Sequence, residues 1–405
     1  MLLTIHPKFQ PNVLGSLKWL AFADSDVRLA TLAEVFIIRP GRDMAVDDKE
    51  RLFTPQDVLK YLSGLVDVWD VWESDYVDGT DMGDEVAYMR LAHYSVKEYL
   101  TSSRITQGPA TAFHFSEVDA RLHIARAFIA YHFYRLAYES NDPHYIAGHP
   151  QWLHHLERVP RDFWTPGVIY DATRALTMQS RSLMKTFIRE VFQTSKVDVA
   201  KHCSNPQWPH CCTALHGFPR ITDMLLSGLP GTNQFLMQEH LDAALQDAVR
   251  GGSIAVVELL LAKGADINAE TAKHGDAMKA AITNRDREFS PRGQEEMMRL
   301  LLDRGFHLNA QRGQPGVAPA GPDGSSGTDW ENAVAGTALY KAAVCGSNVA
   351  CRLLLDEGAD VNAGGGIYGS PLQAAISRWP GGYKDMTLMR DLILLLLDRE
   401  ADVNA

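Results

Sequence analysis

One pattern of apolar and polar positions returns four times in the last third of this chain. Each copy is a short apolar run, then two or three mostly charged residues, then a polar turn that ends in Asn-Ala. The copies occupy residues 256–269, 297–310, 350–363 and 392–405. A recurring phrase of this kind predicts a repeat architecture, in which each unit is stabilised by its neighbours.

The unit from Gly336 to Ala363 shows what each copy predicts. Residues 337–345 form a first short helix that Gly346 ends, and residues 349–357 form a second helix with three consecutive leucines on its buried face. Gly358 then stands where a left-handed residue is needed to end that helix. Neither helix is long enough to be stable alone in water, so we expect pairs of helices to stack.

These phrases resemble the ankyrin repeat, whose consensus joins a TPLHLAA helix to a second helix ending in LLL and a GADVNA turn. The resemblance covers about residues 241–405 as four units, and a fifth, degenerate unit precedes them at 213–226. It implies a C-terminal solenoid over residues 206–405 and a function in binding other proteins. The predicted fold class is therefore mainly α.

The spacing of the repeats departs from the family. The last Asn of each phrase falls at residues 268, 309, 362 and 404, so the spacings are 41, 53 and 42 residues. The ankyrin period is about 33 residues. We expect the extra residues to lie in loops, at 284–294, 311–335 and 378–385. Glu400 replaces the glycine that ends the second helix, so a strained or reshaped turn is expected there.

Apolar spacing near the N-terminus predicts three helices and then a β-hairpin. The third helix has a strong start signal, because Thr54 is followed by proline and an acid. Residues 65–69 and 88–92 read as the two strands of the hairpin, and Ser95 to Leu100 begins another helix. This order is typical of a winged-helix domain.

Three N-terminal phrases resemble the winged-helix segment of NACHT-type nucleotide triphosphatases. They are LKWLAFA at 17–23, LFTPQDVLKYLSGLV at 52–66 and RLAHYSVKEYL at 90–100. The resemblance spans residues 1–105, and we expect a helical linker over 106–205. Such segments are common in fungal proteins that join a NACHT module to ankyrin repeats. The resemblance implies a role in intracellular signalling or nonself recognition. The alternative that it implies is a C-terminal fragment of a NACHT nucleotide-switch ATPase that has lost or lacks its P-loop.

His93 is the one candidate for contact with a nucleotide. In related switch ATPases a His at the equivalent place can contact the diphosphate of ADP, but the Asp that often follows it is missing here. The favoured interpretation is a structural histidine at the end of a strand. The chain has no G-x-x-x-x-G-K-[ST] phosphate cradle, so we expect it to bind no nucleotide and no other cofactor by itself.

Composition narrows the function further. Hydrophobic residues make up 46% of the chain, as in an ordinary globular protein, and the net charge of -11 disfavours nucleic acid as a partner. Five cysteines are few and odd in number, which fits a reducing interior, so a cytoplasmic protein is expected. No apolar run approaches the roughly 20 residues of a membrane span.

Two observations bear on chemistry. His and Cys residues cluster within 202–216, which is the composition of a metal site, but their spacing matches no common zinc pattern, and a domain junction is the favoured interpretation. The chain also lacks H-E-x-x-H, G-x-S-x-G and G-x-G-x-x-G motifs. We therefore expect a non-enzymatic scaffold with no metal, no catalytic residues and no small-molecule substrate.

The expected partner is a protein, bound by turn tips and first helices of the repeats. We predict that Tyr340, Lys341, Phe306 and His307 are exposed there and contact it. Asp266 and Asp360 recur at the turn tips. They are expected first to hold the turns through side-chain to backbone hydrogen bonds and secondarily to present acid to the partner.

Overall fold

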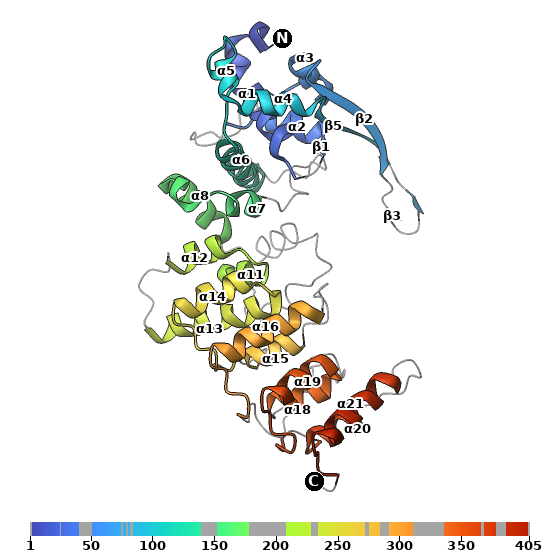
Figure 1. The fold of residues 1–405 in the computed structure, drawn as a ribbon. Helices are drawn as coiled ribbons and strands as arrows, with labels where there is room; N and C mark the ends of the chain where they lie inside the picture. The colour runs from blue at the N-terminus through green and yellow to red at the C-terminus, as the bar shows by residue number, and fades with distance from the viewer. Residues whose placement is uncertain are drawn as a thin grey trace. The chain divides into compact units, whose positions relative to one another are not determined.

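In the computed structural model the chain forms two compact units, residues 1–196 and 197–405 (Figure 1). The predicted loops at 311–335 and 378–385 lie outside the described residues, as do most of the loop at 284–294, residues 178–205 of the predicted linker and Asn404. The described residues are 2–24, 26–39, 51–73, 76–77, 80–81, 84–138, 152–177, 208–227, 234–271, 275–283, 291–310, 336–365, 368–377 and 386–403.

The N-terminal unit contains a small antiparallel sheet in the order β1-β5-β2. Its strands are β1 (Val27–Arg28), β2 (Val66–Glu73) and β5 (Asp84–Leu91), and a separate two-stranded pair joins β3 (Tyr76–Val77) to β4 (Thr80–Asp81). The helices around the sheet are α1 (Gln10–Phe22), α2 (Leu29–Phe36), α3 (Leu59–Leu62), α4 (Tyr94–Thr101) and α5 (Ser103–Thr106). The predicted order of three helices followed by a hairpin is confirmed.

The predicted helix start at Thr54 is confirmed by reciprocal capping, and a second helix of this unit begins in the same way. The Thr54 backbone N–H donates to Asp57 Oδ2 at 2.8 Å, and a turn of 3-10 helix (Pro55–Val58) leads into α3. Ser116 and Asp119 exchange the same kind of bonds, 3.1 Å each, at the start of α6 (Glu117–Tyr138). Helix α6 packs against α1, and α7 (Trp152–Glu157) and α8 (Pro166–Thr177) pack against α6.

The C-terminal unit is a stack of helix pairs, five of them among the described residues. First helices contact one another in the order α11, α13, α15, α18, α20, and second helices do so from α12 to α14 and from α16 through α19 to α21. The pairs are α11 (Pro209–Leu215) with α12 (Pro219–Ser227), α13 (Gln234–Gly251) with α14 (Ile254–Ala262), α15 (Ala277–Ile282) with α16 (Pro291–Asp303), α18 (Ala338–Cys345) with α19 (Asn348–Asp356), and α20 (Pro371–Ser377) with α21 (Met386–Asp398).

The local signals of the repeat phrase match the structure. The three leucines of α19 are buried, as predicted, and Gly358 after it is left-handed with φ +91°. Glu400, the residue that replaces this glycine, takes the same left-handed region with φ 66°. A side chain in that region costs roughly 1–2 kcal/mol, so the predicted strain at this turn is confirmed.

We predict that Glu400→Gly raises the free energy of unfolding by about 1 kcal/mol, because glycine adopts the left-handed conformation without the Cβ clash. The reverse change, Gly358→Glu, is the matched control and should lower stability by a similar amount, since no atom within 4 Å blocks a Cβ there and only the backbone conformation is penalised. Urea unfolding of the three proteins measures both effects. Equal stability of the Glu400→Gly variant and the parent would contradict the strain.

No helix among the described residues combines the length and the apolar character that crossing a bilayer requires.

Candidate protein-binding surface

The turn tips between successive pairs are exposed and internally braced. Asp266 Oδ1 accepts a hydrogen bond from the Asn268 N–H at 2.8 Å, and Asp360 Oδ1 accepts one from the Asn362 N–H at 3.0 Å. Both Asp side chains are exposed. The predicted role of these carboxylates in holding the turns is therefore confirmed.

Asparagine side chains join each tip to the next. Asn268 Nδ2 donates to the Gly305 carbonyl at 3.2 Å, and its Oδ1 accepts from the His307 N–H at 2.9 Å. The same two bonds are made by Asn309 to Gly358 and Asp360, and by Asn362 to Glu400 and Asp402. This ladder fixes Asp266, His307, Asp360 and Asp402 as one row of tips.

The first rung of the ladder is built differently and escaped the sequence analysis. Gln238 Nε2 donates to the Gly264 carbonyl at 3.0 Å, and Asp242 Oδ1 accepts from the Asp266 N–H at 2.7 Å. Both side chains lie on α13, where their four-residue spacing puts them on one face and in contact with each other. Burial raises the pKa of Asp242. These two residues make the bonds that the asparagine of a preceding tip makes elsewhere. The four-residue spacing of Gln238 and Asp242 was the sequence signal from which this could have been predicted.

Two residues predicted to be exposed on α18 are buried. The exposed fractions of Tyr340 and Lys341 are 0% and 4%. The prediction was wrong because α18 packs against both α15 and α20, and also against α19. The Tyr340 hydroxyl accepts a hydrogen bond from the Tyr368 N–H at 3.1 Å, so this side chain braces the following loop and does not face a partner.

Phe306 is also buried, with 6% of its surface exposed, which corrects a third predicted contact residue. It follows the left-handed Gly305 at the position that Ala265 and Ala401 take in other units, and those two are buried as well. Ala359 takes this position after Gly358 and is partly buried, so in three of the four units the residue there packs into the core. His307, one residue on, is exposed as predicted.

Lys341 belongs to a buried cluster of charges between α15 and α18 that the sequence analysis missed. Its Nζ lies 2.8 Å from Asp276 Oδ2, and both side chains are almost fully buried. The other oxygen of Asp276 caps α15 by accepting from the Lys279 N–H at 2.8 Å. Burial, reinforced by the nearby Lys341 charge, lowers the pKa of Lys279 to about 8. The cluster thus holds two lysines around one carboxylate.

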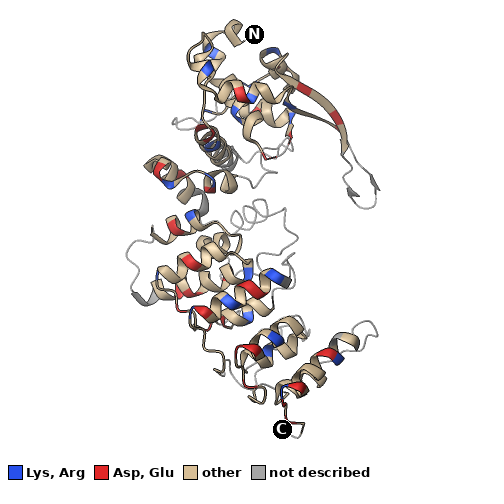
Figure 2. Ribbon diagram, viewed as in Figure 1, with Lys and Arg blue, Asp and Glu red and all other residues tan. Residues whose placement is uncertain are grey.

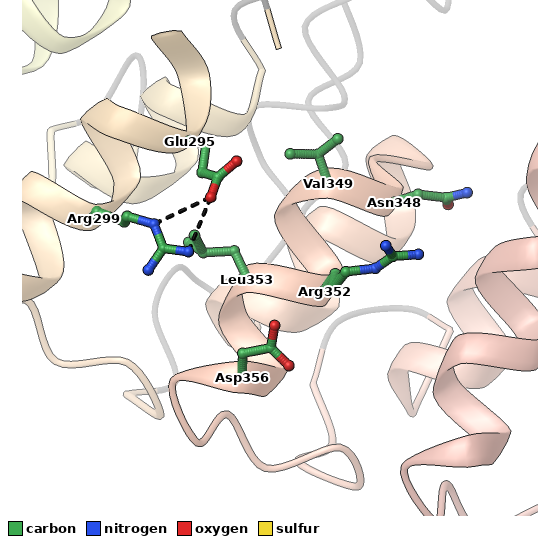
Figure 3. A pocket seen from close by; sticks show the side chains of 7 residues that line it. All are labelled: Glu295, Arg299, Asn348, Val349, Arg352, Leu353 and Asp356. Atoms are coloured by element: carbon green, nitrogen blue, oxygen red, sulfur yellow. Dashed lines mark hydrogen bonds and ion pairs between the residues drawn. The ribbon is translucent and has the colours of Figure 1, made fainter. Parts of the chain in front are cut away.

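A shallow groove lies between α16 and α19, on helices that carry residues of both charge signs (Figures 2 and 3). Its volume is about 250 Å³, below the range of about 300–1,000 Å³ that is usual for small-molecule sites. Arg299 pairs with Glu295 at 2.9 Å and with Glu357 at 3.2 Å, next to the half-exposed Val349. Exposed pairs of this kind contribute little stability.

The predicted cluster of His and Cys residues is only partly described. His202 and Cys203 lie outside the described residues, and among the residues that the structure does describe no three metal-ligand side chains converge. His210 instead contacts His240, with 3.1 Å between Nε2 and Nδ1, and Trp208 packs against both rings. Burial and the neighbouring His240 lower the pKa of His210 to about 3. The pair joins α11 to α13.

Acid should therefore weaken the first helix pair. The folded state holds His210 neutral, whereas the unfolded state can protonate it. The contribution of His210 to the free energy of unfolding is therefore complete above the ordinary pKa of 6.5 and declines as the pH falls toward 3. At pH 5 the loss from this residue should be about 2 kcal/mol. Urea unfolding at pH 7.5 and pH 5 measures it. In His210→Leu the difference between the two pH values should shrink by that amount, and an unchanged difference would contradict the assignment.

The structure also places the nucleotide candidate His93 and two cysteines of the fourth helix pair. His93 caps α4, because its Nδ1 accepts from the Ser95 N–H at 3.1 Å, and it lies exposed at the end of β5. Cys345 and Cys351 are buried, and burial together with Cys345 raises the pKa of the Cys351 thiol. In this setting they act as small apolar residues.

Comparison with known protein families supports the interpretation of the C-terminal unit. The model of the ankyrin repeat matches residues 240–272 and 336–365. The first range covers most of α13, all of α14 and the tip at Asp266, and the second covers α18, α19 and the tip at Asp360. No curated protein matches the chain. Residues 240–365 thus contain ankyrin repeats, a module that generally binds proteins.

Proposed function

We propose that this protein is a non-enzymatic scaffold that binds a partner protein along the row of turn tips. The observation that carries the proposal is the asparagine ladder, which holds Asp266, His307 and Asp360 exposed and in fixed order. A rigid, pre-organised row loses little conformational entropy on binding.

The chemistry of the row indicates the kind of partner. Each of the two carboxylates, Asp266 and Asp360, uses Oδ1 within its own turn, and among the described residues neither Oδ2 has a hydrogen-bond partner. Two acceptors in fixed positions are suited to Lys or Arg side chains of a partner. We infer that the partner presents a basic surface to the tips.

The test is affinity capture from native extract with the full-length chain. The bait variant carries Asp266→Asn, His307→Ala and Asp360→Asn, which keep the turn acceptor atoms and remove the charges and the imidazole. Its matched control carries Asp391→Asn and Asp398→Asn on the exposed part of α21. We expect at least one protein to co-purify with the parent and the control and to be lost from the tip variant. Identical captured sets from all three baits would contradict the proposal.

A relationship to NACHT proteins remains a second, separate proposal. It is supported by the order of α1, α2, α3 and the β2–β5 hairpin in the N-terminal unit, which is the order that a winged helix requires. His93 enters only in that context, and its capping of α4 accounts for it without a nucleotide. Sequencing the transcript upstream of Met1 tests the idea. An in-frame P-loop would support it, and an immediate stop codon would contradict it.

A further inference from the structure

The hairpin of the N-terminal unit has one open edge. All eight residues of β2 pair with β5, from Val66 opposite Leu91 to Glu73 opposite Asp84. The order β1-β5-β2 places β2 at the edge of the sheet, and no other strand of the described chain pairs with it. The hairpin also projects beyond the helices of this unit (Figure 1). Such an edge leaves a row of backbone N–H and C=O groups available for another strand.

The side chains beside this edge are unusually apolar for a surface. The exposed fractions of Val68, Val71 and Trp72 are 41%, 39% and 64%. Because side chains alternate along a strand, Val68 and Trp72 flank the edge on one face and Val71 flanks it on the other. An incoming strand would therefore bury apolar surface on both faces of β2.

The two faces differ in charge. On the face of Val71 the cations already lie on aromatic rings, with Arg90 over Trp69 at 5.1 Å and Arg28 over Tyr88 at 6.0 Å. Trp69 and Tyr88 stack on each other at 6.3 Å, which completes this arrangement. By strand register this face also carries Asp67, Glu73 and Asp84, and its two arginines offset part of that acidity.

The opposite face is acidic. Asp70 lies across from Ala87, and the exposed Trp72 lies across from Glu85. The strand residues that share this face include no Lys or Arg, and acidic positions are visible along the hairpin (Figure 2). Two carboxylates beside an exposed indole form a setting that attracts a cation, through ion pairing and through the face of the ring.

We propose that β2 accepts an extended segment of a partner protein as an added β-strand, with Lys or Arg side chains of that segment over Asp70 and Trp72. Backbone hydrogen bonds along the edge supply affinity, and the acidic face selects a basic sequence. A second copy of this chain is disfavoured, because pairing two β2 edges brings carboxylates of both copies together. The site lies in the N-terminal unit and is independent of the repeat surface.

The test uses the full-length chain and a labelled peptide, acetyl-Arg-Val-Lys-Thr-Val-Thr-amide. In antiparallel pairing the Lys of this peptide lies opposite Asp70, and its Arg lies opposite Trp72. Fluorescence anisotropy should show saturable binding, and hydrogen–deuterium exchange over residues 66–73 should slow in the complex. The matched peptide with Glu in place of Lys and Arg should bind at least about tenfold more weakly. No binding of the basic peptide, or equal binding of both, would overturn the proposal.

Two controls separate strand addition from simple charge attraction. A peptide that is N-methylated at alternate residues keeps its charge but loses edge hydrogen bonds, so it should lose binding. In the protein, Asp70→Lys should weaken binding of the basic peptide at least about tenfold, whereas Asp391→Lys on α21 should leave the binding of this peptide unchanged. Full binding by the methylated peptide would overturn strand addition. If the protein instead self-associates and the basic peptide disrupts that self-association, the choice of a partner protein over a second copy of this chain would be overturned.

Discussion

Replacing Asp276 with Asn is expected to lower the free energy of unfolding of the C-terminal unit by about 3–5 kcal/mol. Asn still caps a helix, so the start of α15 keeps its acceptor for the Lys279 N–H. The change removes only the negative charge, and it leaves the buried Lys341 and Lys279 without their shared buried carboxylate. A buried Lys341 ammonium group that has lost its carboxylate is costly because water cannot solvate it.

A second substitution tests the cause of that loss. In the Asp276→Asn background, Lys341→Met removes one of the two buried cations and keeps a long apolar stem, so a large part of the lost stability should return. Urea unfolding of the parent, the single variant and the double variant measures this. A loss below about 1 kcal/mol in the single variant, or no recovery in the double variant, would show that the cluster does not hold α15 to α18 as described.

Replacing Gly251 with Ala is expected to cost about 3 kcal/mol or more. A Cβ at this position would lie 2.0 Å from the carbonyl oxygen of Leu215 and 2.7 Å from its carbonyl carbon. Both are backbone atoms at the end of α11, so they cannot move aside as a side chain would. The contact between α11 and α13 must open, and the first helix pair should separate from the stack.

The matched control for Gly251→Ala is Gly364→Ala, which lies after the tip of the fourth pair and has no atom within 4 Å of the added Cβ. Its effect should stay within about 0.5 kcal/mol. Thermal and urea unfolding of both variants, with exchange of the α11 amides as a local measure, tests the close approach. Equal effects of the two substitutions would contradict it.

Much of the C-terminal fold could be predicted because its signals are local. The leucines of α19, the left-handed Gly358 and the strained Glu400 each follow from a few neighbouring residues. The cap at Thr54 could be predicted for the same reason. The first strand of the hairpin was predicted to end at Trp69, whereas β2 continues to Glu73, since pairing with β5 extends it beyond the apolar alternation.

The candidate contact residues were harder to predict than the fold, because the exposure of a helix residue depends on residues that are distant in the sequence. Lys341 was predicted to be exposed because it lies on a first helix of the repeats, but its partner Asp276 lies 65 residues away at the start of another helix. Tyr340 is enclosed by helices from two neighbouring pairs. Asp266, His307 and Asp360 were placed correctly at the surface, because a polar turn between two helices is exposed whatever its neighbours are.

The most direct test of the central claim, that the braced row of turn tips is the docking face, is hydrogen–deuterium exchange of the full-length chain alone and in complex with the captured partner. We predict slower exchange around Asp266, His307 and Asp360 in the complex, with little change on the far ends of α14 and α19. Protection confined to other surfaces, with the three tips exchanging as in the unbound protein, would contradict this account.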